Sequence, residues 1–80
     1  MKRTWFNIAL FYKAWGWNAN VSTKRKRFWK GDTQVLAEQI YKKKDWKVVI
    51  VKGNTIVGSD IVNEANAKIL VSEYIWSLSE

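Results

Sequence analysis

The side chains with the most chemistry to offer are cations, and the densest group lies near the middle of the chain. It holds a run of four with a fifth close behind: Lys24, Arg25, Lys26, Arg27 and Lys30. Ammonium and guanidinium groups at this density neutralise phosphates and release counterions from a polyanion. Lysine also protects exposed strand edges against edge-to-edge pairing, but four consecutive cations exceed that need. The cluster therefore predicts contact with a phosphate backbone.

A second basic cluster follows further along the chain. It consists of Lys42, Lys43 and Lys44, with Lys47 nearby. If a helix ends here, its dipole favours positive charge in the last turn, which explains much of the cluster without a partner. A binding role is the weaker interpretation of these lysines.

Aromatic side chains accompany the first basic cluster. The chain holds six Trp, three Tyr and three Phe. Single-stranded nucleic acid is bound by surfaces on which bases stack on aromatic rings while cations follow the phosphates. The alternative is that these rings cover the thin core of a small domain and the charges are simply solvated. The predicted nucleic-acid-binding residues are Lys24, Arg25, Lys26, Arg27, Trp29, Lys30, Trp5 and Phe11.

Two further pairs of apolar residues suggest contact with a protein or with a second copy of the chain. Trp15 and Trp17 flank Gly16 in an expected turn, where an exposed indole would anchor an interface. Ile69 and Trp76 lie seven residues apart on the side of the last helix away from its apolar face. The alternative for the first pair is that its turn folds back and buries one tryptophan, and the alternative for the second pair is that the chain's first loop covers it. A homodimer is among the expected partners.

Catalytic groups are scarce, so we expect no enzymatic activity. The chain has no His and no Cys, which removes the commonest nucleophiles, bases and zinc ligands. No two carboxylates have a spacing that indicates a metal site or an acid–base pair, and no glycine-rich phosphate loop occurs. We expect no cofactor and no metal. The carboxylates are Asp32, Glu38, Asp45, Asp60, Glu64, Glu73 and Glu80.

Length and charge bound the class of protein. Eighty residues make a single domain over 1–80, and a net charge of +7 favours polyanionic partners. The longest apolar stretch runs from Trp5 to Tyr12, well short of the roughly 20 residues of a membrane span. The charged start is not expected to be a signal peptide, because tryptophans stand where small residues would allow cleavage. Absence of cysteine fits a cytoplasmic location.

Periodicity and turn residues predict an α+β domain in the order ββαββα. The expected elements are a strand over 3–13, a turn over 15–20, a strand over 21–30, a helix from Asp32 to Lys44, a strand over 46–52, a hairpin turn over 52–55, a strand from 55 to about 58 and a helix over 63–77. Asp32 and Asn63 are the expected helix N-caps. The strand over 46–52 is apolar on both faces, which favours a central position in the sheet.

The expected architecture is one antiparallel sheet with two helices on one face and the other face open. In the first strand the core set is expected to be Phe6, Ile8, Leu10 and Tyr12, and the open set Trp5, Asn7, Ala9 and Phe11. In the second strand two sets compete for the open face: Thr23, Arg25, Arg27 and Trp29, or Lys24, Lys26, Phe28 and Lys30. Either set places an aromatic ring among cations.

Two hypotheses about function follow. The first is a non-catalytic nucleic-acid-binding domain that uses a basic, aromatic sheet surface for single strands or for duplex backbone. The second is a small phage-type protein that inhibits a host enzyme or defence complex by protein contacts, as anti-restriction and anti-CRISPR proteins do. The phage origin is suggested by size and style alone. An interfacial membrane role is disfavoured, because neither expected helix combines a wide apolar face with a basic one.

Overall fold

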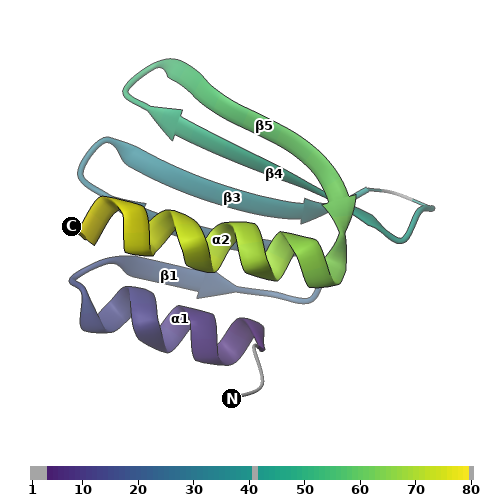
Figure 1. Ribbon diagram of the computed structural model, residues 1–80, viewed down its shortest axis with the longest axis horizontal. Coiled ribbons are helices and arrows are strands. Elements are labelled where there is room, and N and C mark those ends of the chain that lie inside the picture. Colours follow the sequence, from purple (N-terminus) through teal and green to yellow (C-terminus); the bar gives the residue numbers. More distant parts are fainter. Residues whose placement is uncertain (1–3, 41, 80) are drawn as a thin grey trace.

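The computed structural model describes residues 4–40 and 42–79, with the side chains of 78 and 79 excepted. The elements are α1 (Trp5–Ala14), β1 (Asn18–Val21), β2 (Arg25–Lys30), β3 (Thr33–Gln39), β4 (Asp45–Lys52), β5 (Thr55–Asn63) and α2 (Glu64–Ser79). The strands form one antiparallel sheet in the order β1-β2-β3-β4-β5, so each strand pairs with its neighbour in sequence (Figure 1). Short hairpin connections make this simple arrangement possible.

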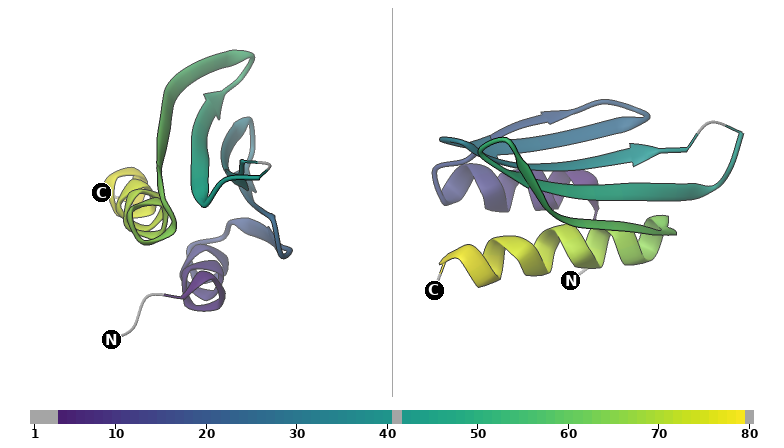
Figure 2. Two further views of the ribbon diagram at one scale, coloured as in Figure 1. Left: turned by 90° about the vertical axis from the view of Figure 1, so that its right-hand side faces the viewer. Right: turned by 90° about the horizontal axis from the view of Figure 1, so that it is seen from above.

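Both helices cover the same face of the sheet, and the other face is bare (Figure 2). α1 packs against β1 and β2, while α2 packs against β3, β4 and β5, and the two helices also touch each other. The prediction of an α+β domain with an antiparallel sheet is confirmed. The predicted ββαββα order is wrong. The observed order is αβββββα, in which one helix precedes the five strands and the other follows them.

The expected first strand is helix α1. Trp5, Ile8, Ala9 and Tyr12 recur at helical spacing and are the buried residues of this helix. Thr4 caps it, accepting a hydrogen bond at Oγ1 from the backbone N–H of Asn7 at 3.1 Å. The segment is apolar on nearly every side, so it fits a period of two as well as one of 3.6.

The core set expected for that segment is therefore half wrong. Ile8 and Tyr12 are buried, but Phe6 and Leu10 are 70% and 50% exposed. In the set expected on the open face, Trp5 and Ala9 are instead buried beneath the helix. Arg3, where the strand was expected to begin, lies outside the described residues.

The expected helix from Asp32 to Lys44 is strand β3 and the loop after it. Val35 and Ala37 alternate into the core, and β3 pairs with β2 on one side and β4 on the other. Leu, Ala, Glu and Gln prefer helices only weakly, and two flanking strands override that preference. Asp32 belongs to the β2–β3 turn and is no N-cap, while Tyr41, which falls within the expected helix, lies outside the described residues.

Strand β1 is missing from the prediction, which has four strands, whereas the remaining elements are found with shifted boundaries. Strand β1 occupies part of the expected turn, and β2 begins at Arg25. β4 is interior, as its apolar faces predicted, and the hairpin turn follows it with Gly53 at a φ of 63°. β5 is longer than expected and carries a bulge opposite Ile50 and Val51. Asn63 caps α2, since its Oδ1 accepts a hydrogen bond from the Asn66 N–H at 2.8 Å.

The core between the helices and the sheet combines aliphatic side chains with a group of aromatic rings around Tyr12. Tyr12 stacks on Phe28 with ring centroids 4.4 Å apart and meets the edge of Trp17 at 5.1 Å. Its hydroxyl donates a 2.6 Å hydrogen bond to the carbonyl of Val71 in α2. Burial raises the pKa of Tyr12, with a smaller contribution from Tyr74. This one residue ties both helices to the sheet in a chain that has no cysteine for disulfides.

The face of α2 expected to pack inward does so. Ala67, Val71 and Ile75 are buried, and Leu70 and Tyr74 are partly buried against the same core. The side chain of Leu78, also expected there, lies outside the described part of the chain.

Candidate nucleic-acid interface

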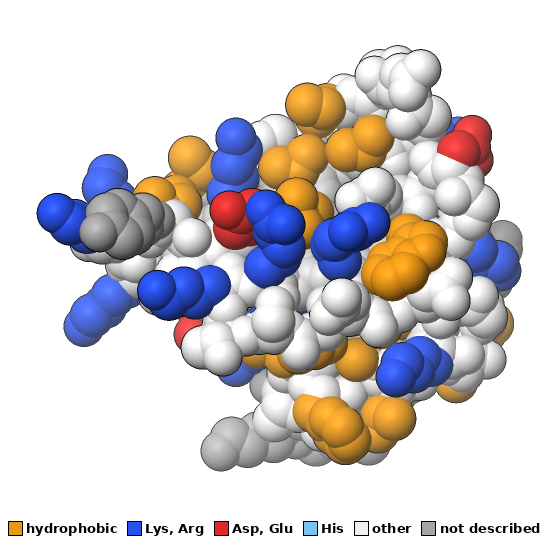
Figure 3. Space-filling model, turned by 180° about the vertical axis from the view of Figure 1, so that it is seen from behind, with side chains coloured by type: hydrophobic (Ala, Val, Ile, Leu, Met, Phe, Trp, Pro, Cys, Tyr) orange, Lys and Arg blue, Asp and Glu red, His pale blue; other side chains and the backbone are white. Residues whose placement is uncertain are grey.

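The open face of the sheet is organised in rows, because residues paired across antiparallel strands point to the same side. One row crosses four strands as Arg25, Glu38, Lys47 and Ile61. The next holds Asn20, Arg27, Leu36, Val49 and Ser59. A third holds Asn18, Trp29, Gln34, Val51 and Ile56. Figure 3 shows the resulting surface, on which cations alternate with hydrophobic side chains and acidic groups are few.

Strand β2 contributes the arginines and the indole of this face. Of the two sets left open by the sequence, the one with Arg25, Arg27 and Trp29 faces outward, while Lys26 and Phe28 are buried. The Arg27 guanidinium carbon lies 5.0 Å from the centre of the Trp29 ring, within cation–π range. The two side chains form a stacked pair, here called the Trp29 platform.

A basic groove of about 670 Å³ lies at the end of the sheet where the β1–β2 and β3–β4 loops meet. It is lined by Lys24, Arg25, Glu38, Gln39, Ile40, Lys42, Lys43 and Lys44. The backbone N–H of Gln39 donates to the carbonyl of Lys24 at 2.9 Å. This hydrogen bond fixes the β1–β2 loop against the end of β3. Two basic clusters that are separate in the sequence thus share one groove.

Most of the positive charge in the basic groove is not neutralised by the protein itself. Arg25 pairs with Glu38 at 3.3 Å, but both side chains are about half exposed, so this pair contributes little stability. Within residues 4–40 and 42–79, Lys24, Lys43 and Lys44 form no ion pair. Their repulsion is the cost of holding them together, and a bound anion would relieve it.

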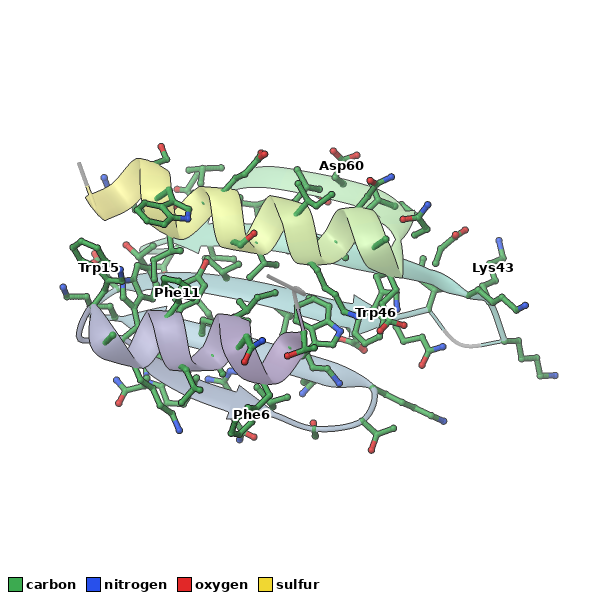
Figure 4. All side chains as sticks on the ribbon, turned by 60° about the horizontal axis from the view of Figure 1, so that its bottom comes forward. Phe6, Phe11, Trp15, Lys43, Trp46 and Asp60 are labelled. Atoms are coloured by element: carbon green, nitrogen blue, oxygen red, sulfur yellow. The ribbon has the colours of Figure 1, made fainter. Side chains whose placement is uncertain are left out.

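The β3–β4 loop that presents the lysines has a defined backbone. The Ile40 N–H donates to the carbonyl of Asp45, and the Lys43 N–H donates to the carbonyl of Ile40, both at 3.0 Å. Lys42 has a φ of 63°, the left-handed conformation that non-glycine residues rarely adopt. Figure 4 shows Lys43 projecting from this loop at the end of the molecule away from Trp15 and Phe11.

Two residues predicted to bind nucleic acid are instead core residues. Trp5 is 9% exposed and Lys26 is 5% exposed. The Lys26 ammonium group lies 5.9 Å from the Trp5 ring centre and 5.2 Å from that of Trp46, and it donates hydrogen bonds to the carbonyls of Ser22 and Thr23. Lys26 is buried because alternate residues of β2 point to opposite faces of the sheet. Trp5 is buried because its segment is a helix and not the predicted strand.

Other members of the predicted set lie apart from the open face. Phe11 is exposed on α1, on the helical side of the molecule. Lys30 is exposed at the end of β2, where its ammonium group donates to the Trp15 carbonyl at 3.3 Å and so caps α1. Arg25, Arg27 and Trp29 lie on the open face, and Lys24 and Arg25 line the basic groove.

Of the four residues expected to contact a protein, one is buried and three are exposed. Trp17 is 7% exposed and belongs to the core. Trp15 and Trp76 are 44% and 54% exposed, with ring centroids 6.5 Å apart, and Phe11 lies 6.1 Å from Trp76. Ile69 is marginally exposed on α2. The exposed rings that were expected to anchor a protein contact therefore lie on the helical side, away from the basic groove.

Sequence reasoning undervalued two parts of the site. The helix-capping role that the sequence suggests for Lys43 and Lys44 is wrong, because both lysines lie in a loop between strands. Asn18 and Gln34, which flank Trp29 on the neighbouring strands, were placed in a turn and a helix. A usable signal was present in Lys30-Gly31-Asp32-Thr33, because Gly-Asp between two runs is typical of a tight hairpin.

Among the described residues, no group of three His, Cys, Asp or Glu side chains is placed to hold a metal ion. Neither helix, over the residues described, is long and apolar enough to cross a membrane. Comparison with protein-family models, with curated proteins and with solved structures found no match.

Proposed function

We propose that this protein binds nucleic acid, with the basic groove as the main phosphate-binding site. The observation that carries the proposal is the meeting of the two basic clusters. Five cations and one carboxylate line a groove that continues onto the exposed, arginine-bearing face of the sheet. A solubilising role alone would be served by cations spread over the surface, without two loops being brought together.

The physics of polyelectrolytes supplies the affinity. Each phosphate neutralised releases condensed counterions, so the logarithm of the binding constant falls linearly with the logarithm of salt, by about 0.7 per contact on a single strand and about 0.9 on a duplex. A cation paired with a carboxylate, as Arg25 is with Glu38, must exchange that partner for a phosphate when it binds. Lys24, Lys43 and Lys44 form no such pair in the described part of the chain, so their charge is available to a ligand.

The test compares two double variants that remove equal charge. Lys43→Gln with Lys44→Gln takes two cations from the basic groove, whereas Lys13→Gln with Lys52→Gln takes two exposed cations from elsewhere. Binding of a fluorescein-labelled oligonucleotide is followed by anisotropy at several salt concentrations. We expect the groove variant to lose affinity and to reduce the salt slope by about 1.4 for a single strand. The control variant should stay near wild type.

Two results would contradict the proposal. One is the absence of any anisotropy change with wild-type protein at low salt. The other is an equal loss in the two variants, which would show that only total charge matters.

A further inference from the structure

Two carboxamide side chains flank the Trp29 platform on the open face. On the open face Trp29 lies directly opposite Asn18 of β1 on one side and Gln34 of β3 on the other. Each carboxamide offers two donor hydrogens and an acceptor oxygen. An aromatic ring between two carboxamides has the groups that a nucleobase needs, namely a surface for its face and partners for its edge.

The platform and the basic groove lie on one line along β2. Trp29, Arg27 and Arg25 are alternate residues of this strand and point to the same side, and Arg25 lines the groove. At about 3.3 Å per residue, Trp29 lies roughly 13 Å from Arg25. Aromatic surface and phosphate-binding charge are therefore joined along one track.

We propose that this track selects single-stranded nucleic acid, with a base stacked on the Trp29 platform and its phosphates led by Arg27 and Arg25 into the basic groove. The inference rests on the proposed function and adds the class of ligand. In a duplex the base faces are covered by their neighbours, so Trp29, Asn18 and Gln34 have nothing to contact. In a single strand a base can turn out and stack, and its Watson–Crick edge is free.

The first experiment changes the ligand and leaves the protein intact. Wild-type protein is titrated against three labelled probes of one length: a mixed-sequence single strand, its duplex, and an abasic strand that keeps the phosphates without the bases. Stacking of one base is expected to make the intact strand bind about 5- to 150-fold more tightly than the abasic strand. The duplex should bind more weakly than the intact single strand at equal salt.

The second experiment changes the protein. Trp29→Ala should remove most of the preference for the intact strand over the abasic strand, while leaving the salt slope unchanged because no cation is lost. Phe6→Ala is the matched control, since Phe6 is 70% exposed on the helical side and should leave the preference intact (Figure 4). Trp29→Phe keeps a ring and should keep part of the preference. Circular dichroism melts establish that each variant is folded.

The outcomes separate this inference from the proposed function. Equal binding of intact and abasic strands overturns the inference and leaves phosphate binding in the groove standing. A duplex that binds as tightly as the single strand, with no effect of Trp29→Ala, overturns it as well. Failure of all three probes to bind would instead overturn the proposed function itself. Oligoribonucleotide and oligodeoxyribonucleotide versions of the probes show which sugar is preferred.

Discussion

At the scale of single residues, Lys26 shows how alternation along a strand gives neighbouring cations opposite fates. Arg25 and Arg27 face solvent, whereas Lys26 between them is inserted beside Trp5 and Trp46. Burial lowers the pKa of Lys26, and the nearby Glu64 carboxylate opposes that effect in part. Contact with two indole faces and two backbone carbonyls compensates the ammonium for lost water.

The lowered pKa of Lys26 makes a prediction about stability and pH. Below its folded-state pKa the lysine is protonated in both states, and the cost of burying the charge is fully present. Between that pKa and the unfolded value near 10.5, this residue binds a proton more readily in the unfolded chain, so the contribution of Lys26 to the free energy of unfolding rises with pH. We expect Lys26→Met to lack this rise. Urea denaturation of both proteins from neutral pH to about pH 10 measures it.

Lys24→Met is the control for that experiment, because Lys24 is an exposed neighbour in the same basic run. It should keep the wild-type dependence on pH. Parallel curves for wild type and Lys26→Met would show that the buried amine does not titrate differently in the folded state.

At the scale of elements, the two hairpin turns share a pattern that fixes the middle of the sheet. Lys30-Gly31-Asp32-Thr33 and Lys52-Gly53-Asn54-Thr55 have the same order of residue types, and their glycines have φ values of 59° and 63°. The turns also touch, since the Gly53 N–H donates to the Asp32 carbonyl at 2.8 Å. The second turn matches the predicted hairpin, whereas the first lies where a helix was predicted to begin. Treating both alike would have placed β3 correctly.

The cap of α2 is an element whose contribution can be measured directly. Asn63→Ala removes the side-chain oxygen that accepts the Asn66 N–H, and we expect a loss of about 1 kcal/mol in the free energy of unfolding. Asn66→Ala is the matched control, because it keeps that backbone N–H and places a better helix former inside α2. Chemical denaturation should give a loss for the first variant and none for the second. Equal effects would show that the cap is not formed in solution.

Across the whole molecule, basic side chains and exposed aromatic rings occupy different sides. The basic groove and the open face lie on the sheet side, whereas the exposed rings of Phe11, Trp15 and Trp76 lie together on the helical side. In Figure 4 the loop with Lys43 and the residues Trp15 and Phe11 are at opposite ends. A ligand in the groove therefore leaves the aromatic cluster uncovered.

The positive charge concentrated in the basic groove should lower the stability of the folded protein. Removing it should therefore weaken nucleic-acid binding but raise the melting temperature. We expect Lys43→Gln with Lys44→Gln to raise the melting temperature by about 2–4 °C at low salt, because repulsion within the groove is reduced. Added salt should shrink the difference by screening. Lys13→Gln with Lys52→Gln should give a smaller rise, since Lys13 stabilises the last turn of α1. A groove variant that melts below wild type at low salt would contradict this trade-off.

Features that depend on residue type or on contacts at short range can be predicted from the amino-acid sequence. These include the net charge of +7, the lack of His and Cys, the two basic clusters, strand β4 with the turn after it, and the capped helix α2. Each is read from composition or from a window of a few residues, where turn chemistry and capping act.

The other features depend on contacts between distant parts of the chain. Residues 5–14 fit helix and strand patterns equally, and burial of Trp5, Ile8 and Tyr12 against the sheet selects the helix. Pairing with two neighbours makes 33–39 a strand, and that strand carries the second basic cluster to the end of the sheet beside the first. Contacts between residues distant in the chain fix these outcomes, and no local pattern contains them.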